Sequence, residues 1–174
     1  MNRPKHIVVH HTGGTDANPL ADTSHHTFGV VDNWHKKLWN FRSSLGHYIG
    51  YHYFIDKTGK VTQGRADWDE GAHTRGYNSV TLGVCLAGNF DATKPSKEQE
   101  EALRELLLRL MNKHNITLEN CVPHRKFANK TCYGRNLPDN WLQKLVGAPK
   151  DAVCKLSLFT TKQIIDELLA RFRR

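Results

Sequence analysis

The stretch His6-Ile7-Val8-Val9-His10-His11-Thr12 decides how this 174-residue chain is expected to fold. The consecutive β-branched residues Ile7–Val9 are typical of a strand buried on both faces, because such a strand lacks the apolar–polar alternation of a half-exposed one. The pattern predicts a central strand over His6–His10. His10 then lies at the end of that strand, and side-chain alternation places His11 on the opposite face, as a core hydrogen-bonding histidine.

Further strands are predicted on either side of a polar segment. Ile49–Ile55 has the composition of a strand, and the turn Asp56–Gly59 leads to a second short strand at Val61–Gln63, which together predict a hairpin. Arg65–Asn78 is irregular and polar, as is Gly13–Ser24, so both are expected to be loops that border a recognition surface. Another buried strand follows the first of these loops, at residues 80–86.

Helices are predicted where apolar residues recur at helical spacing. One covers Thr27–Phe41. A second begins at the capping box formed by Ser96 and Gln99 and ends near His114. Its leucines form a stripe that is expected to pack in the core. A last short strand is predicted around Val122.

Composition limits the class of protein and of partner. Apolar residues make up 39% of the chain and charged residues 24%, as in ordinary globular domains, and the net charge is +8. No apolar run is long enough for a transmembrane helix, and the first residues lack a signal-peptide core, so synthesis in the cytoplasm is expected. The positive charge favours a polyanionic partner, namely nucleic acid, an anionic membrane or a bacterial wall. Without a basic tract or zinc-finger spacing, nucleic acid is not expected as the main partner.

The chain has four cysteines, and free thiols are expected because the chain is long and carries no export signal. Cys85 lies within a predicted buried strand and is expected to act as a small apolar residue. Cys121 and Cys154 are either inert or paired.

A second stretch, Pro123-His124-Arg125-Lys126-Phe127-Ala128-Asn129-Lys130-Thr131-Cys132, carries candidate metal ligands. Imidazole and thiolate are the donors that zinc prefers, and a histidine from the N-terminal strand would complete a His/His/Cys site with one open position, as in catalytic zinc sites. A lysine beside a metal suits the stabilisation of negative charge on a substrate. Three other histidines, His25, His26 and His35, are expected at surface or boundary positions.

Four segments occur together in one order. These are Ile7–Thr12, Gly50–Ile55, Gly71–Asn78 followed by Gly83, and the stretch from His124 to Cys132. The combination resembles the zinc N-acetylmuramoyl-L-alanine amidases, the superfamily of amidase-type phage lysozymes and peptidoglycan recognition proteins. The resemblance spans roughly residues 5–145.

The resemblance implies an α/β fold, with a central mixed sheet flanked by helices and a substrate groove over the metal. It implies zinc ligation by His10, His124 and Cys132. It also implies that Tyr51 and Lys130 line the zinc and assist catalysis.

Two further residues, His73 and Asn78, match a family stretch near the groove and are expected to bind substrate. The sequence departs from the family pattern in two places. Tyr133 follows the candidate cysteine ligand where the family commonly has proline, and the segment between Trp34 and Tyr51 is longer than in compact phage enzymes.

The implied function is zinc-dependent hydrolysis of the amide between N-acetylmuramic acid and L-alanine in peptidoglycan, as a monomeric phage endolysin that is made in the cytoplasm and acts on the wall. Two alternatives remain. One is a peptidoglycan-binding module without catalysis, although such binders typically lack the cysteine that stands at Cys132. The other is an amidase that recycles soluble wall fragments in the cytoplasm.

The predicted organisation is a catalytic domain at 1–150 and a helical tail at 151–174, joined through a linker at residues 147–151. The tail has an apolar stripe and a basic face, as do helices that lie on anionic surfaces. It is expected to dock on the domain, with contact to an anionic wall polymer or membrane as the alternative. The stripe comprises Ile164, Ile165, Leu168, Leu169 and Phe172, and the basic residues are Lys162, Arg171, Arg173 and Arg174.

Overall fold

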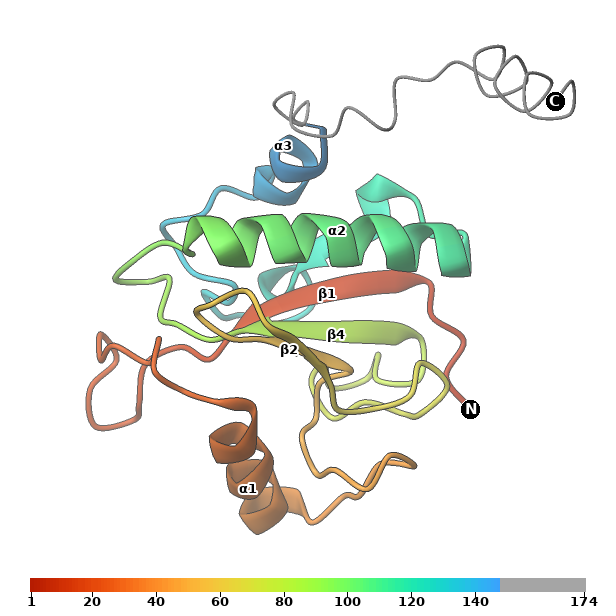
Figure 1. The fold of residues 1–174 in the computed structure, drawn as a ribbon, viewed down its shortest axis with the longest axis horizontal. Coiled ribbons are helices and arrows are strands. Elements are labelled where there is room, and N and C mark those ends of the chain that lie inside the picture. The colour runs from red at the N-terminus through yellow and green to blue at the C-terminus, as the bar shows by residue number, and fades with distance from the viewer. Residues whose placement is uncertain (148–174) are drawn as a thin grey trace, which may run out of the picture.

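The structure is a computed structural model that describes residues 1–147. It contains a five-stranded sheet in the order β3-β2-β4-β1-β5 (Figure 1). The strands are β1 (His6–His11), β2 (Tyr53–Ile55), β3 (Val61–Gln63), β4 (Thr81–Leu86) and β5 (Cys121–Pro123). Only the β2–β3 pair is antiparallel among these neighbours, so the sheet is mixed, as predicted. The tail predicted at 151–174 lies outside the described residues.

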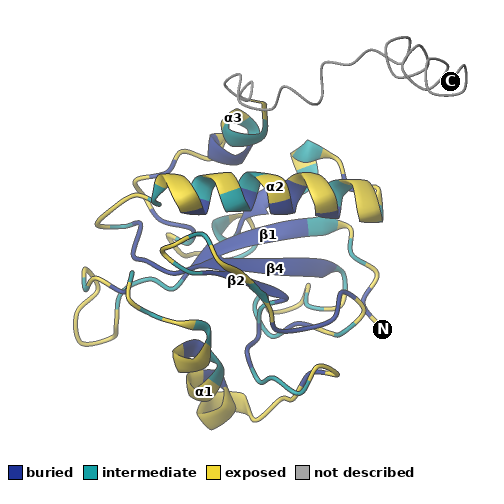
Figure 2. Ribbon diagram, viewed as in Figure 1, coloured by how far each residue is buried: buried dark blue, intermediate teal, exposed yellow. Residues whose placement is uncertain are grey.

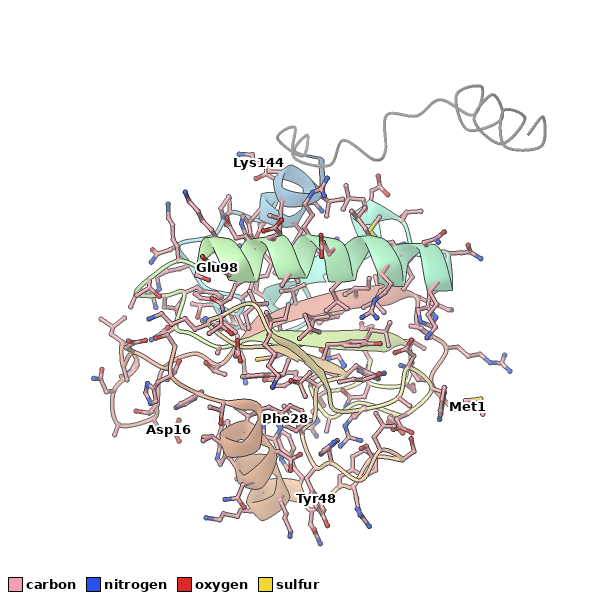
Figure 3. The ribbon with its side chains drawn as sticks, in the orientation of Figure 1. Met1, Asp16, Phe28, Tyr48, Glu98 and Lys144 are labelled. Carbon is pink, nitrogen blue, oxygen red and sulfur yellow. The ribbon has the colours of Figure 1, made fainter. Side chains whose placement is uncertain are left out.

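Helices cover both faces of the sheet. Helices α2 (Lys97–His114) and α3 (Trp141–Gly147) lie on one side, and α1 (Phe28–Trp39) lies on the other (Figure 1). The labelled side chains show the same layers: Glu98 and Lys144 lie on the first side, and Phe28 and Tyr48 lie on the second (Figure 3). Gly147, predicted to begin a linker, instead ends α3. None of the described helices is long and apolar enough to cross a membrane.

The sheet separates two apolar clusters of unequal size. The larger one packs α2 and α3 against β1 and β4, and the smaller one packs Val31 of α1 against Phe54 and Cys85. Cys85 is fully buried, as predicted. Figure 2 shows β1, β2 and β4 buried between these layers, whereas α1 is mostly exposed.

Strand β1 is the central element that its β-branched residues predicted. It pairs in parallel with β4 on one side and β5 on the other, and Ile7, Val8 and Val9 have no exposed surface. It extends one residue further than expected, to His11. His10 and His11 face opposite sides of the sheet, and His11 Nδ1 accepts a bond from Phe90 N at 2.9 Å, which agrees with its predicted role in the core.

The prediction of a strand over Ile49–Ile55 was wrong for its first half. Only Tyr53–Ile55 form β2, although the hairpin with β3 is present. The backbone N–H groups of Tyr48 and Ile49 donate to Asp32 Oδ1, at 2.6 and 2.8 Å. These two N–H groups therefore bond to a side chain of α1 rather than to a neighbouring strand. Ile49 is buried without being part of a strand, so its apolar side chain was a misleading signal.

The prediction that His35 lies at a surface or boundary position was also wrong. Its side chain is 2% exposed, and its Nδ1 accepts a 2.9 Å bond from Gly50 N. This bond anchors α1 to the segment that leads into β2. The apolar residues that indicated the helix are largely exposed instead: Val30 is 52% exposed, Trp34 55% and Leu38 52%.

Helix α2 forms as its sequence predicted. Ser96 and Gln99 make both bonds of the capping box. The helix ends at His114, where Asn115 adopts a left-handed conformation with φ of 52°. Its stripe packs into the larger cluster through Leu103, Leu106, Leu107 and Leu110.

Two buried histidines make folding stability dependent on pH. Burial is the main cause that lowers the pKa of His35 and of His52 to about 4. His35 Nδ1 accepts a hydrogen bond from Gly50 N, and His52 Nδ1 accepts one from Gly83 N. Protonating either nitrogen would break its hydrogen bond. The unfolded chain binds these protons near pH 6.5, so it binds more protons than the folded chain between pH 4 and 6.5.

We therefore expect the free energy of unfolding to fall as the pH is lowered from about 6.5 to about 4. One pKa unit corresponds to about 1.4 kcal/mol, so the loss should amount to several kcal/mol. Urea titrations of metal-free protein at pH 7 and pH 5 would measure it. Replacing the exposed His25 by asparagine should leave the difference unchanged, and equal stability at the two pH values would contradict the prediction.

Candidate metal centre

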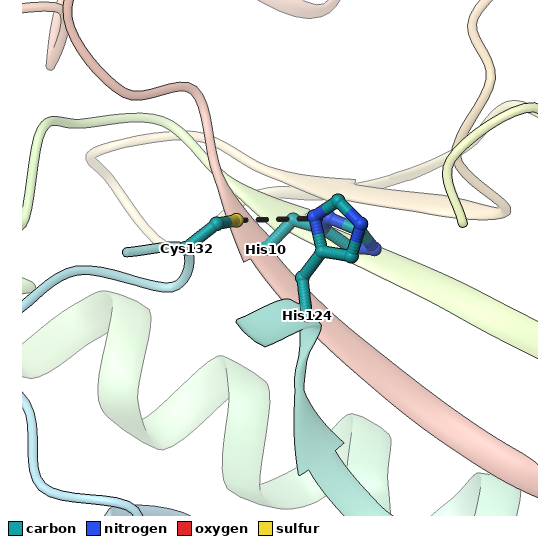
Figure 4. A group of neighbouring side chains, drawn as sticks. All are labelled: His10, His124 and Cys132. Atoms are coloured by element: carbon teal, nitrogen blue, oxygen red, sulfur yellow. Dashed lines mark hydrogen bonds between the residues drawn. The ribbon is translucent and has the colours of Figure 1, made fainter. Parts of the chain in front are cut away.

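Three side chains from two distant parts of the chain point toward one another at one end of the sheet (Figure 4). The nearest donor atoms of His10, His124 and Cys132 all lie within 4.8 Å of one another. The strand register explains the first pair: Val9 lies opposite Pro123, and parallel strands end at the same edge of a sheet. His10 and His124 are the next residues, and their ring centroids are 4.5 Å apart.

The donor set fits zinc. Two imidazoles and a thiol are the ligands that zinc prefers, and its bond lengths at a tetrahedral angle place a nitrogen and a sulfur about 3.6 Å apart. The distance from His10 Nδ1 to Cys132 Sγ is 3.7 Å. A ring must be neutral to ligate, and burial holds the pKa of His10 well below its usual value, reinforced by the neighbouring His73 and His124.

Cys132 must lose a proton to ligate. Burial raises the pKa of the Cys132 thiol to about 12. A hydrogen bond with the backbone of His11 and the charge of Lys130 act in the opposite direction, but they are smaller effects. The metal-free residue is therefore a thiol at neutral pH. Metal binding at this site would release its proton.

The loop that carries Cys132 is held by Arg125, a residue that the sequence interpretation did not single out. Arg125 N donates to Cys132 O at 2.7 Å. Its guanidinium donates to Gly134 O at 2.9 Å, to Leu137 O at 2.7 Å and to Asp139 Oδ1 at 2.6 Å. Arg125 thereby fixes the loop beside His124, the residue that precedes it. Its position next to a candidate ligand was the only signal in the sequence.

Asp91 supports the same loop from the other side. Its carboxylate accepts a bond from Thr131 Oγ1 at 2.6 Å and one from Arg135 N at 2.7 Å. Burial would raise the pKa of Asp91, but these bonds outweigh it and hold the pKa below its ordinary value. Asp91 is therefore an ionised anchor for the residues on both sides of Cys132.

A groove of about 1220 Å³ lies over the three side chains. All of the residues to which the sequence assigned a site role line it. These are His10, Tyr51, His73, Asn78, His124, Lys130 and Cys132. The groove also includes residues that the interpretation did not assign: Trp34, His35 and Trp39 on α1, and Arg75 in the loop before β4.

Tyr51 and Lys130 lie beside the candidate ligands. The Tyr51 ring centroid is 5.0 Å from that of His10. Burial raises the pKa of the Tyr51 hydroxyl well above its usual value, with smaller contributions from Cys85 and Cys132. Tyr51 is therefore a hydrogen-bond donor at neutral pH. Lys130 is exposed in the groove, and its charge lowers the pKa of His124, after the larger effect of burial.

His73 and Asn78 belong to one loop in the groove wall. Asn78 Oδ1 accepts bonds from the backbone N–H groups of His73 and Thr74, at 2.9 and 2.8 Å. Asn78 therefore shapes the loop. The side chain of His73 points toward the candidate metal centre, and its Nδ1 lies 3.1 Å from His10 Nε2.

A sequence profile described as N-acetylmuramoyl-L-alanine amidase matches residues 1–135. The chain belongs to this amidase family. The matched range contains the three candidate ligands and most of the described sheet and helices, so the resemblance of the motifs is confirmed at the level of the family.

Relatives of this amidase-family chain include phage endolysins and peptidoglycan recognition proteins. An endolysin of Klebsiella phage KP32 is 38% identical over 99 residues, which cover 53% of this chain and 64% of that protein. Peptidoglycan-recognition protein SD of Drosophila simulans is 34% identical over 106 residues, 60% of this chain and 52% of that protein. The chain thus spans between half and two thirds of the length of these relatives.

The fold of this amidase-family chain is also found in solved structures. N-acetylmuramoyl-L-alanine amidase LysC from Clostridium intestinale superposes with a TM-score of 0.66 at 28% identity, covering 85% of this chain and 88% of that one. Drosophila peptidoglycan recognition protein SD gives a TM-score of 0.63 at 26% identity, covering 79% and 78%.

Proposed function

We propose that this chain is a zinc-dependent amidase that hydrolyses the bond between N-acetylmuramic acid and L-alanine in peptidoglycan. The observation that carries the proposal is the convergence of His10, His124 and Cys132 at the base of an open groove. Three protein ligands with access from one side are typical of a catalytic rather than a structural zinc site. The endolysins and the amidase among its relatives support the choice of reaction.

The chain's own residues supply binding and charge stabilisation. A bound zinc contributes a Lewis acid that polarises the amide carbonyl and makes water acidic enough to react at neutral pH. Lys130 places a positive charge at the groove wall, where it stabilises the negative charge that develops on the carbonyl oxygen. The protonated hydroxyl of Tyr51 donates a hydrogen bond to the same oxygen. The buried walls around His10 strengthen both interactions by excluding water.

Other groove residues bind the substrate in this proposal. Asn78 contributes its amide group to the wall from the loop that it shapes. Arg75 provides a cation for the carboxylates of the peptide stem. The exposed rings of Trp34 and Trp39 offer flat apolar surface at the α1 side of the groove.

We further propose an endolysin role, in which the enzyme acts on the intact wall. The phage relatives favour this role, and the net charge of +8 suits a wall that carries phosphate and carboxylate groups. A recycling amidase would use the same groove on soluble fragments. A recognition protein would bind peptidoglycan without cleaving it.

Digestion of purified peptidoglycan tests the reaction. We expect new L-alanine amino groups without new reducing sugar ends. Activity should disappear on treatment with a chelator and return when zinc is added, because the donor set suits that ion. Binding without new termini, from a folded and zinc-loaded sample, would contradict catalysis.

The choice of substrate separates the two amidase roles. An endolysin should release amino groups from intact walls at rates comparable to those on small muropeptides. Cleavage confined to soluble muropeptides would favour recycling and contradict the endolysin role.

A further inference from the structure

The two ring nitrogens of His10 have different partners. Nδ1 lies 3.7 Å from Cys132 Sγ and faces the candidate metal centre. Nε2 lies on the other side of the ring, 3.1 Å from Nδ1 of His73. The His73 ring meets the His10 ring edge to face, with 5.1 Å between the centroids. His73 therefore contacts a candidate ligand from the side that faces away from the metal.

Metal ligation would fix the tautomers of both rings. A neutral imidazole carries one proton, and Nδ1 of His10 must be bare to bind a metal. The proton of His10 is then on Nε2, which donates to Nδ1 of His73. That nitrogen accepts, so the proton of His73 is on its Nε2. Only this arrangement keeps the 3.1 Å contact between the two rings a hydrogen bond when His10 is a ligand.

The hydrogen-bond chain ends at a backbone carbonyl. His73 Nε2 lies 3.5 Å from Thr81 Oγ1, and Thr81 Oγ1 donates to Tyr77 O at 2.8 Å. The threonine oxygen can accept the His73 proton because its own proton is used elsewhere. Thr74 Oγ1 is a second neighbour of His73 Nδ1, at 2.9 Å. The protons on His10 Nε2, His73 Nε2 and Thr81 Oγ1 thus each have an acceptor.

The surrounding backbone leaves the His73 ring little freedom to turn away. A Cβ atom at Gly71 would lie 2.5 Å from the ring, and one at Gly83 would lie 2.6 Å from it. Glycine at both positions lets the backbone approach the imidazole closely. Asn78 fixes the backbone of the same residue through the bond to His73 N. The ring is therefore held in place before any metal binds.

We propose that His73 is a positioning residue, which holds His10 in the ring orientation and tautomer that zinc ligation requires. The inference rests on the zinc site of the proposed function. Outer groups that accept the distal proton of a metal-bound histidine orient the ring and increase its basicity, and losing one typically weakens metal affinity about 10–100-fold. Here the acceptor is a neutral histidine, in place of the more usual carboxylate or backbone carbonyl.

Zinc affinity of the full chain, measured by competition with a chromophoric chelator, tests the proposal. His73→Ala should weaken zinc binding about 10–100-fold. His73→Asn should retain most of the affinity, because its Oδ1 is an acceptor at the same position along the side chain as Nδ1. His35→Asn is the matched control: His35 is also a buried histidine of the groove wall, but its Nδ1 bonds to Gly50 N, so zinc affinity should not change.

A second variant moves the ring without changing either histidine. Gly83→Ala should displace the His73 ring and weaken zinc binding in the same direction as His73→Ala. Thermal unfolding of metal-free samples shows whether each variant folds. A folded Gly83→Ala variant with wild-type zinc affinity would argue against the proposal.

Nitrogen-15 NMR of the zinc-loaded wild type provides a test that needs no variant. We expect His10 and His73 each to carry the ring proton on Nε2. A proton on Nδ1 of His73 would overturn the proposal.

The outcomes separate this inference from the proposed function. A wild type that binds no zinc and digests no wall would remove the proposed function itself. Zinc binding by the wild type with equal affinity in His73→Ala would overturn only the positioning role, and a raised KM in that variant would assign His73 to substrate contact. Equal loss of zinc affinity in the alanine and asparagine variants, with a lower Tm of the metal-free protein, would assign it to structure.

Discussion

Replacing Cys132 by serine should abolish amidase activity and weaken zinc binding by more than the roughly 100-fold that loss of an outer group causes. A serine hydroxyl is a poor zinc ligand, whereas a thiolate is a strong one that also neutralises charge. Equilibrium dialysis against zinc, together with the release of L-alanine amino groups from peptidoglycan, would measure both effects. The metal-free fold should be retained, because serine differs from cysteine only in the γ atom.

Cys121→Ala is the matched control for this variant. Cys121 is another free thiol, buried in β5, and it does not line the groove of the candidate metal centre. Its removal should leave zinc binding and activity near the wild-type values. Zinc-dependent activity that survives in Cys132→Ser would exclude Cys132 as a ligand.

Replacing Lys130 by alanine should lower kcat on the order of 100-fold to 1000-fold, the usual effect of removing one group that stabilises a developing oxyanion. Zinc affinity should fall little, because Lys130 is not a donor. KM should change less than kcat if the charge acts mainly in the transition state. Steady-state kinetics on a soluble muropeptide, with zinc content measured on the same samples, would separate these effects.

The matched control for Lys130 is Lys126→Ala. Both lysines are exposed and lie in the same loop region, but only Lys130 lines the groove over the candidate ligands. Both changes remove one positive charge, so a general electrostatic effect on wall binding should appear in both. Full activity in Lys130→Ala would remove lysine from the mechanism. An equal loss in both variants would attribute its effect to net charge.

Elements with strong local patterns were predictable from the sequence. Strand β1 follows from three consecutive β-branched residues, α2 from its capping box and leucine stripe, and the hairpin from its turn. The errors arose where backbone N–H groups bond to side chains of a distant segment instead of to the backbone of a neighbouring strand. Asp32 and His35 of α1 bond to the backbone at residues 48–50, and no local pattern reveals that pairing. Hence β2 was predicted too long, and His35 was predicted at a surface or boundary position.

The candidate site was predictable to a similar extent. The donor residues were identified from the resemblance of their motifs, and the structure places them within reach of one ion. The supporting residues were not found. Arg125 donates to the backbone carbonyl of Leu137, and Asp91 accepts from the backbone N–H of Arg135. Such bonds depend on how the loop folds rather than on residue type. Charged residues next to a ligand carry no signal that distinguishes an anchor from a solvated side chain.

The strand order also governs when the protein can become active during its synthesis. Strand β1 is made first, yet its partners are among the later residues: His6 pairs with Thr81, and Ile7 with Cys121. Among the strands of residues 1–147, only the β2–β3 hairpin pairs strands that are close in the chain. Contacts of such high sequence separation slow folding, because long segments must be ordered before the pairing contributes. The groove can therefore be completed only after Cys132 has left the ribosome, so translation products that stop before it should lack the proposed amidase activity.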